Sequence, residues 1–281
     1  MDRSPPVVLT IAGFDPSSGA GVTADVKTIA AHGCYGVGCI TALTVQSTAG
    51  VQRVEGITPE LVAQTLDELR ADLEISAVHI GMLGSASVVR AVADFLEKAG
   101  LPNIVLDPII KSSSGHDLID AAGLRLLIER LLPLAAVITP NVDEAAALTG
   151  LLVTNLEQMR AAATRLHQMG AASVVITGGH LEKAIDLLSF ASPRGAQQEV
   201  FKSDRLRSNS THGTGCAFST AMACHLARGR GLPEAVLLAK AYVAAAIANA
   251  HPLGRGSGPV HHLYRMHQRR RVVINDPEPP N

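Results

Sequence analysis

The sequence predicts an α/β protein in which a mostly parallel central sheet carries helices on both faces. Short β-rich segments and helix-periodic segments alternate along nearly the whole 281-residue chain, as successive βαβ units require. The composition is 47% hydrophobic but only 3% aromatic, so aliphatic side chains must fill the core, which is typical of buried parallel strands. Neither an internal repeat nor a linker interrupts this pattern, and we therefore expect one domain over residues 1–281.

The first half of the chain contains four expected strands, each followed by an expected helix. The helix from Pro59 is the clearest, because apolar residues between Leu61 and Leu69 recur on one face and Thr58 is a suitable N-cap. The expected strands are Val7–Ala12, Tyr35–Val45, Ala77–Ile80 and Asn103–Leu106. The expected helices are Gly21–His32, Pro59–Leu73, Ser87–Ala99 and Leu118–Leu132.

The second half continues the alternation and ends in two apolar helices. The expected strands are Ala135–Ile138 and Ser173–Ile176, with a strand pair formed by Leu187–Phe190 and Glu199–Lys202. The expected helices are Asp143–Leu148, Leu156–Met169, Gly215–Ala227 and Leu232–Ala250. From about Gly254 the chain is rich in Gly, His, Arg and Pro, so we expect a core over residues 7–251 and a loose tail over 254–281.

Charge and composition exclude several classes of partner. Lys and Arg number 24 against 25 Asp and Glu, so no basic field exists to attract nucleic acid or an anionic membrane. No uninterrupted apolar stretch is long enough to span a bilayer. The four cysteines lack metal-ligand spacing, and the N-terminus lacks the layout of a signal peptide. These observations indicate a cytoplasmic protein that binds small molecules.

Polar segments follow the expected strands at their carboxyl ends, where open α/β sheets bind ligands. Each segment alone is an ordinary polar loop, but six of them in register indicate a site. These segments are Gly13–Gly21, Gln46, Gly81–Gly84, Asp107–Gly115, Thr139–Glu144 and Thr177–His180.

The segment Thr211–Ser219 is the most informative part of the chain. Small and hydroxyl residues precede an alanine-rich helix, whose first N–H groups lack internal partners and whose dipole is positive at that end. Gly213 and Gly215 permit an anion to approach the backbone, and Cys216 would be acidified beside it. The alternative is a glycine-rich turn with a buried cysteine at a helix start.

Three further positions have both a binding and a structural interpretation. Asn141 and Glu144 stand three residues apart at a helix start, where they could hold hydrated Mg²⁺ or simply cap the helix. Asp107 could hold Mg²⁺ or orient a turn before Pro108. Lys111 could reach a phosphate or remain a solvated loop lysine.

Two common nucleotide motifs do not explain the chain. The P-loop pattern is absent. Gly19–Ala24 fits the dinucleotide pattern, but Gln46 stands where the next strand should end in an acidic residue. A nicotinamide-linked oxidoreductase is therefore only a remote alternative.

Taken together, these motifs resemble the hydroxymethylpyrimidine/phosphomethylpyrimidine kinases of thiamine biosynthesis, within the ribokinase-like superfamily. The resemblance covers about Val7 to His251. The segments that carry it appear in order: Thr10–Lys27, Ile40–Thr48, Ile80–Leu83, Asp107–Pro108, Thr139–Glu144, Gly178–His180, Thr211–Cys216 and Ala239–Ile247.

The resemblance implies a ribokinase-like three-layer sandwich that uses ATP and Mg²⁺ to phosphorylate 4-amino-5-hydroxymethyl-2-methylpyrimidine and then its monophosphate. It also implies a homodimer. Cys216 would occupy the position of the catalytic Asp of sugar kinases, with Gly213 and Gly215 forming the anion hole. The implied pyrimidine pocket comprises Gly13, Asp25, Gln46, Met82 and Ile109. The implied ATP and phosphate residues are Lys111, Asn141, Thr177, Gly179, Thr211, Thr214 and Lys240. The implied metal-site residues are Asp107, Asn141 and Glu144, directly or through water.

Departures from the family pattern leave alternatives open. Phe14 replaces the usual Ser and Thr177 the frequent Lys, and residues 109–112 differ from the usual stretch, which weakens the roles of Ile109 and Lys111. Pyridoxal kinases share this scaffold and also act on a flat ring that bears a hydroxymethyl group, although the amide of Gln46 favours an aminopyrimidine. A non-catalytic pyrimidine-binding regulator is the remaining alternative.

Overall fold

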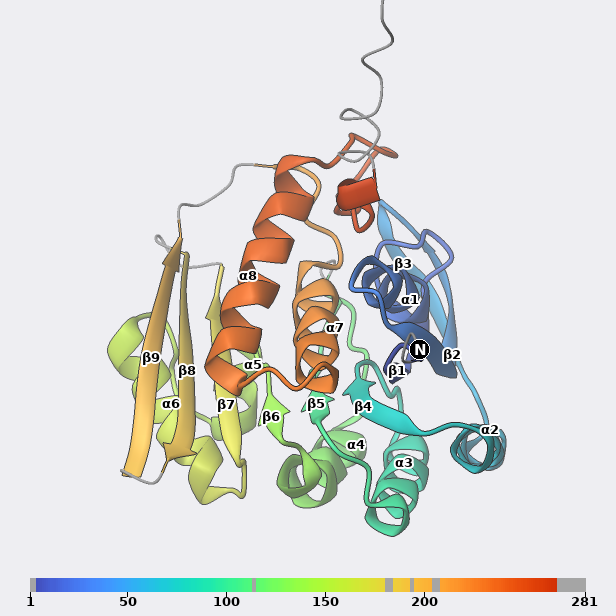
Figure 1. Ribbon diagram of the computed structural model, residues 1–281, viewed down its shortest axis with the longest axis horizontal. Helices are drawn as coiled ribbons and strands as arrows, with labels where there is room; N and C mark the ends of the chain where they lie inside the picture. The colour runs from blue at the N-terminus through green and yellow to red at the C-terminus, as the bar shows by residue number, and fades with distance from the viewer. Residues whose placement is uncertain (1–3, 113–114, 180–183, 193–194, 204–207, 267–281) are drawn as a thin grey trace, which may run out of the picture.

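The computed structural model describes residues 4–112, 115–179, 184–192, 195–203 and 208–266 (Figure 1). Within them, strands β1 to β9 form one sheet in the order β3-β2-β1-β4-β5-β6-β7-β8-β9. Strands β2, β1, β4, β5, β6 and β7 are mutually parallel, while β3, β8 and β9 are antiparallel additions at the two edges. The strand bounds are Val7–Phe14, Tyr35–Ser47, Gly50–Gly56, Ile75–Ile80, Ile104–Leu106, Val137–Ile138, Ser173–Gly178, Ala184–Ser192 and Gly195–Ser203.

Helices α1 to α6 connect strands, and α7 and α8 follow the last strand. Their bounds are Gly21–Ala31, Pro59–Asp72, Ala86–Ala99, Ala121–Leu126, Val142–Thr149, Leu156–Gln168, Thr214–Ala227 and Leu232–Ala248. A π-helical turn, Leu127–Leu131, and a 3₁₀ turn, Leu132–Leu134, extend α4, so the single helix expected over 118–132 begins later and is irregular. Pro133 lies in that last turn, where its missing N–H disrupts regular α-helical bonding.

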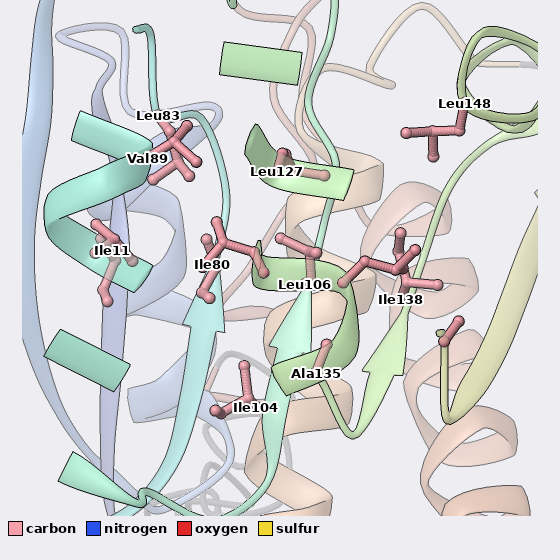
Figure 2. Close-up of a cluster of buried hydrophobic side chains, with 14 of the residues drawn as sticks. Ile11, Ile80, Leu83, Val89, Ile104, Leu106, Leu127, Ala135, Ile138 and Leu148 are labelled. Atoms are coloured by element: carbon pink, nitrogen blue, oxygen red, sulfur yellow. The ribbon is translucent and has the colours of Figure 1, made fainter. Parts of the chain in front are cut away.

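Alternating side chains of the strands feed two separate apolar cores. In β5, Ile104 and Leu106 belong to one core while Val105 belongs to the other. The first core, part of which is drawn in Figure 2, takes its helical residues from α2, α3, α5 and α6. The second takes them from α1, α7 and α8, which lie together in front of the sheet in Figure 1. The period-2 pattern of the strands therefore determines which helices each face accepts.

Helix α7 packs on the sheet with α1 and α8 as its neighbours on the same face, and its composition follows from that position (Figure 1). Every residue from Ala217 to Cys224 is buried, so the helix has no polar face. Alanines and other small side chains allow close packing against the sheet and its neighbours. This packing fixes the start of α7 relative to the strand ends.

Three sequence expectations about the elements need correction. Strand β3 was not expected, because its segment is polar and largely exposed at the sheet edge and so lacks an apolar run. Strands β8 and β9 are longer than the expected pair. The expected loose tail is packed in its described part: Val260, His262 and Tyr264 are buried in the second core, and the Tyr242 hydroxyl donates to the carbonyl of His262 at 2.9 Å. The remainder of that tail, 267–281, lies outside the described residues.

A histidine cluster lies where this C-terminal segment packs on α1, α7 and α8. It comprises His32, His225 and His262, and the rings of the first two meet edge to face at 5.0 Å. Burial lowers the pKa of all three to about 4.

None of the described helices combines the length and apolar character needed to cross a bilayer.

Candidate active site

The loops that follow the six parallel strands meet at one edge of the sheet, as the sequence predicts. At this edge the chain after β6 continues beside β7, because Asn141 bridges to Thr177 and the Thr177 N–H donates to the Pro140 carbonyl at 2.9 Å. His180, at the end of the last of these segments, lies outside the described residues. The polar segments that seemed ordinary one by one therefore surround a common area.

Two glycine-rich loops interlock at the centre of this edge. Gly213 has a φ of 80°, and a Cβ at this position would lie 1.8 Å from the carbonyl oxygen of Gly19. A Cβ on Gly19 would in turn lie 2.2 Å from the His212 ring. Only glycine permits both contacts. The loop between β1 and α1 thus holds the segment that begins α7.

The start of α7 offers backbone donors to an anion. The N–H of Thr214 bonds the Thr211 carbonyl at 3.3 Å and that of Ala217 bonds the Gly213 carbonyl at 2.9 Å. Among the described residues, the N–H groups of Gly215 and Cys216 find no acceptor. Gly215 is exposed, and its missing side chain would have only Asp107 Oδ2, at 3.9 Å, within contact distance. This geometry suits a phosphate group at the positive end of the helix.

The Cys216 thiol is not acidified, which corrects the sequence expectation. Cys216 as a residue is partly exposed. Burial of its thiol nevertheless raises the pKa of the thiol well above the usual value. The carboxylates of Asp107, Asp25 and Glu144 raise the pKa further, while a hydrogen bond from the Gly21 backbone lowers it. These effects together outweigh the helix dipole, so Cys216 is a neutral thiol in the free protein.

A buried chain of polar side chains connects Asp25 to Asp107 beneath the α7 start. His79 lies with Nδ1 3.2 Å from Asp25 Oδ2 and with Nε2 2.9 Å from Ser219 Oγ. Ser219 Oγ donates to Asp107 Oδ2 at 3.1 Å. Asp25 also accepts from the hydroxyls of Thr10 at 2.6 Å and Thr220 at 2.8 Å. Asp25 is fully buried among these groups, so it supports the site from below in the free protein.

Two members of this chain, His79 and Asp107, have shifted pKa values. Burial alone would lower the pKa of His79, but Asp25 and Asp107 outweigh it and raise that pKa. Burial raises the pKa of Asp107 to about 6, although His79 and the Ser219 hydroxyl act in the opposite direction. Protonation of His79, which these carboxylates favour, would compensate part of the negative charge under the site.

Asn141 and Glu144 form a capping box at the start of α5. Asn141 Oδ1 accepts from the N–H groups of Asp143 and Glu144 at 2.9 Å each, and Glu144 Oε2 accepts from the Asn141 N–H at 2.9 Å. The capping interpretation is therefore confirmed. Burial and the nearby Asp107 charge raise the pKa of Glu144 to about 8. The carboxyl groups of Asp107, after β5, and Glu144, after β6, are therefore close enough for their charges to interact. The described residues contain no cluster of three or more His, Cys, Asp or Glu side chains that could hold a metal ion.

An apolar wall lies at the ends of β2, β4 and β5. It comprises Ala42, Met82 and Leu118, with Val54 and Ile109 packed against them. Three of the residues predicted for the pyrimidine pocket, Gly13, Met82 and Ile109, meet here. Met82 and Ile109 belong to the wall, and a Cβ on Gly13 would lie 2.9 Å from Met82 Sδ. Ala42, Met82 and Leu118 are buried, so a flat ring would contact mainly the partly exposed side chains of Ile109 and Val54.

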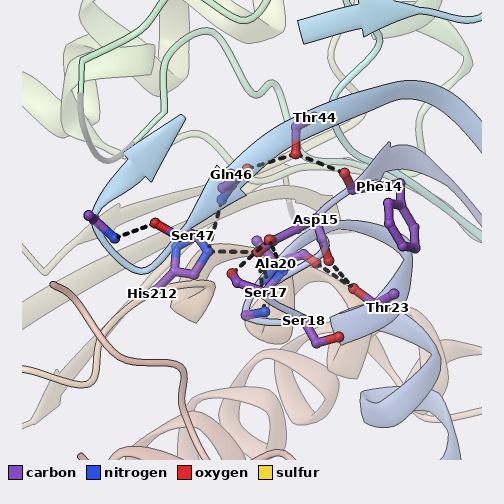
Figure 3. Close-up of polar contacts among 12 residues, drawn as sticks. Phe14, Asp15, Ser17, Ser18, Ala20, Thr23, Thr44, Gln46, Ser47 and His212 are labelled. Carbon is purple, nitrogen blue, oxygen red and sulfur yellow. Dashed lines mark hydrogen bonds and ion pairs between the residues drawn. The ribbon is translucent and has the colours of Figure 1, made fainter. Parts of the chain in front are cut away.

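Gln46 follows this wall on β2 and contacts the α7 loop (Figure 3). Its Nε2 lies 3.2 Å from His212 Nε2, and its Oε1 lies 3.2 Å from the Thr44 hydroxyl. His212 Nε2 also lies 2.8 Å from Asp15 Oδ2. The side chain predicted to recognise the pyrimidine is thereby joined to the predicted anion hole.

The residues predicted to bind ATP fall into three locations. Thr211 and Thr214 lie at the start of α7. Thr177 and Gly179 lie at the end of β7, where Asp186 accepts from the Gly178 N–H at 3.0 Å and pairs with Lys240 of α8. Lys111 lies apart from both groups, because its exposed ammonium pairs with Asp117 at 3.4 Å.

Sequence reasoning did not single out Asp15, His79, His212 and Ser219 as functional residues. His79 interrupts an apolar strand, and a titratable residue in a buried run was the available signal. Ser219 and His212 lie within the α7 segment that was identified, but their partners are distant in the sequence.

The comparisons with known proteins agree with this geometry. The model of the phosphomethylpyrimidine kinase family matches residues 15–261. The chain belongs to this family. It is 45% identical over 258 residues to the thiamine biosynthesis bifunctional protein ThiED of Geobacter sulfurreducens, covering 91% of the chain and 52% of that protein. It is 44% identical over 259 residues to the hydroxymethylpyrimidine/phosphomethylpyrimidine kinase of Salmonella typhimurium, covering 91% and 97% respectively. The family resemblance seen in the sequence is confirmed.

Solved structures show the same fold in two kinds of kinase. Phosphomethylpyrimidine kinase from Clostridium difficile superposes with a TM-score of 0.76 at 35% identity, covering 86% of this chain and 99% of that one. The ADP complex of Bacillus subtilis pyridoxal kinase gives a TM-score of 0.84 at 34% identity, covering 94% and 100%. The scaffold is therefore shared by kinases named for a pyrimidine and for pyridoxal.

Proposed function

We propose that this chain transfers phosphate from ATP to the hydroxymethyl group of 4-amino-5-hydroxymethyl-2-methylpyrimidine and then phosphorylates the monophosphate to the diphosphate. The observation that carries the proposal is the open start of α7. There, the N–H groups of Gly215 and Cys216 face an exposed area that also borders Asp107. The relatives named for this activity support the same conclusion.

The residues around this area divide the work of binding and transfer. The pyrimidine ring lies against the apolar wall, and the Gln46 amide binds its polar edge, since an amide both donates and accepts. The phosphoryl group in transfer is held by the α7 backbone, which stabilises the charge spread over its oxygens. Thr177, Gly179 and Lys240 lie on the side from which ATP approaches.

Cys216 orients the accepting hydroxyl. Phosphoryl transfer depends mostly on positioning and charge neutralisation, so little deprotonation is required before the bond to phosphorus forms. A thiol that is neutral in the free protein is suited to hydrogen-bond this hydroxyl. It would take the hydroxyl proton only after losing its own proton to solvent, which cationic charge nearby would favour.

Mg²⁺ fits the carboxyl pair at the ends of β5 and β6. Asp107 and Glu144 are buried and have raised pKa values, that of Glu144 partly because of the Asp107 charge, and a bound cation would oppose these shifts. Mg²⁺ prefers oxygen ligands and often takes only one or two carboxylates together with nucleotide phosphates. When bound, it would neutralise phosphate charge. Asn141, engaged in capping, would act through water.

The remaining expectations belong to the same proposal. The two apolar cores on opposite faces of the sheet support a ribokinase-like three-layer domain. We also infer a cytoplasmic homodimer, for which size-exclusion chromatography with light scattering is the direct measurement.

One incubation tests the proposal. Purified protein receives ATP, Mg²⁺ and either the pyrimidine or pyridoxal, and mass spectrometry identifies the products. We expect pyrimidine monophosphate followed by diphosphate. Monophosphate without diphosphate contradicts the second step. Efficient phosphorylation of pyridoxal, with none of the pyrimidine, would instead favour the activity named for the Bacillus subtilis neighbour.

A further inference from the structure

Asp15, His212 and Gln46 form a continuous polar chain beside the proposed substrate site (Figure 3). Asp15 belongs to the loop between β1 and α1, His212 to the loop before α7, and Gln46 to the end of β2. The side chains of Asp15 and His212 are only 4% and 13% exposed, so solvent competes little with their contact. The proposed function does not account for Asp15 or His212.

Asp15 is an ionised acceptor. It receives the Ser17 N–H at 2.8 Å and the Ser17 hydroxyl at 2.7 Å, and the N–H groups of Gly19 at 3.2 Å and Ala20 at 2.9 Å. Burial would raise its pKa, but hydrogen bonds from His212, Ser17 and Ala20 lower that pKa to about 2. A carboxylate has no proton to donate, so His212 Nε2 must carry the proton in its 2.8 Å contact with Asp15.

The protonated His212 nitrogen determines how the Gln46 amide must be turned. An N–H of Gln46 aimed at His212 Nε2 would oppose two donors at 3.2 Å. A half-turn of the amide resolves this conflict, because its oxygen then shares the single His212 Nε2–H with Asp15 Oδ2 in a bifurcated bond, and its nitrogen donates to the Thr44 oxygen. The Thr44 hydroxyl remains free to donate to the Phe14 carbonyl at 2.9 Å, so each donor in the chain has an acceptor.

We propose that the Asp15–His212 pair is a specificity device that fixes the orientation of the Gln46 amide and thereby selects 4-aminopyrimidines over 4-oxopyrimidines. After its contacts with His212 and Thr44, the amide retains one N–H donor and one oxygen lone pair in a fixed order. A 4-aminopyrimidine presents an N–H next to a ring nitrogen acceptor, whereas a 4-oxopyrimidine presents an oxygen acceptor next to a ring N–H. A fixed amide matches only one order, and an amide free to turn matches both.

The interlocked glycines explain why His212 can act in this way. The His212 ring lies against the bare Cα of Gly19, and the neighbouring Gly213 lies against the Gly19 carbonyl. These contacts hold the ring in place independently of the substrate. His212 is therefore a positioning residue, which acts on the substrate through Gln46.

The test compares kcat/KM for the 4-amino and 4-oxo forms of 5-hydroxymethyl-2-methylpyrimidine, in wild type and in His212→Phe. It rests on the proposed function. The wild-type protein should prefer the amino form by at least about 100-fold, because reversal of both bonds leaves site groups unpaired. His212→Phe keeps a ring beside Gly19 but lacks the donor, so the preference should fall below about 10-fold while KM for ATP changes less than about 2-fold. His212→Gln, which keeps an N–H donor, should restore most of the preference.

The outcomes separate the inference from the proposed function. If wild type phosphorylates neither pyrimidine, the proposed function fails. If wild type acts on the amino form but His212→Phe keeps the full preference, the function stands and the inference is overturned. If His212→Phe does not fold, Thr44→Val provides the second variant, because it releases the other end of the amide. Its preference should also fall, and an unchanged preference would overturn the inference.

Discussion

Replacement of Ser219 by Ala is the most direct probe of the buried chain beneath the α7 start. The Ser219 hydroxyl lies 2.9 Å from His79 Nε2 and 3.1 Å from Asp107 Oδ2, and His79 is fully buried. Alanine removes only one oxygen, so packing changes little. The substitution leaves an imidazole nitrogen without a partner and frees one oxygen of Asp107.

The magnitude follows from the charge and burial of these groups. A hydrogen bond to a charged group contributes about 1.5–3 kcal/mol, and a buried donor left unpaired costs its full desolvation. We therefore expect Ser219→Ala to lower the free energy of unfolding by about 2–4 kcal/mol. At roughly 2–4 °C per kcal/mol for a chain of this size, the thermal midpoint should fall by roughly 4–16 °C. Because Asp107 loses an orienting bond, kcat should fall by about 10–100-fold and the Mg²⁺ concentration for half-maximal rate should rise.

Urea denaturation measures the change in the free energy of unfolding, and the steady-state rate of ADP formation measures the change in kcat. Ser189→Ala is the matched control, because the Ser189 hydroxyl also contacts a histidine, His167 Nε2 at 3.0 Å, but on β8. This control should cost about 1 kcal/mol and leave kcat unchanged. Equal kinetics in Ser219→Ala and Ser189→Ala, with Ser219→Ala less than about 0.5 kcal/mol from wild type, would refute the inferred charge compensation.

Four further predictions concern the start of α7 and the histidine cluster. Gly213→Ala should lose more than about 3 kcal/mol of stability by chemical denaturation, since its Cβ would collide with the Gly19 carbonyl. Gly215→Ala should fold within about 1 kcal/mol of wild type yet lose activity, because its methyl group would face the phosphate site. Alkylation of Cys216 by iodoacetamide, followed by mass spectrometry, should be slow at pH 7 and faster with Mg²⁺, whereas rapid alkylation without metal would contradict the raised pKa. The pKa values of the histidine cluster, near 4, lie below the unfolded value of about 6.5, so the unfolded state binds more protons between them. The contribution of the histidine cluster to the free energy of unfolding should therefore be constant above pH 6.5 and fall by roughly 3 kcal/mol or more towards pH 4. The raised pKa values of Asp107 and Glu144 act in the opposite direction, so the measurement compares wild type with His225→Phe. Acidification should cost wild type more stability than the variant, and equal losses would contradict this account.

Most of the fold could be predicted from the sequence, because parallel strands are buried on both faces and read as apolar runs. Strand β3 could not be predicted in this way, since it lies at the edge with its polar side chains in solvent and is held by backbone pairing to β2. The C-terminal segment was misjudged for a related reason. Its Gly, Pro and His content is typical of a loop, and only tertiary contact shows that Val260 and Tyr264 complete a core.

The sequence allowed the loops that form the candidate site to be predicted, but not which side chains within them contact one another. Strand direction alone brings the polar segments to one edge. The family resemblance placed Met82 and Ile109 in one pocket, and these two residues do pack together. Asp25 was expected to line the pocket, yet its carboxylate is enclosed by Thr10, Thr220 and His79. Such partnerships join residues far apart in the chain, and no local pattern encodes them.

The Cys216 thiol shows why a local rule can fail inside a correctly identified site. A helix N-terminus stabilises a negative charge by about 0.3–1 kcal/mol when exposed and about 2 kcal/mol at best, which lowers a pKa by little more than one unit. Burial of the sulfur acts in the opposite direction, and so do three carboxylates, those of Asp107, Asp25 and Glu144. Each of these effects alone can reach the size of the dipole effect. The same carboxylates that keep the thiol protonated are those proposed to hold Mg²⁺ or to balance His79. The acidity of the thiol is therefore a property of the loaded site rather than of the helix, and it would rise only when cationic charge enters with the nucleotide.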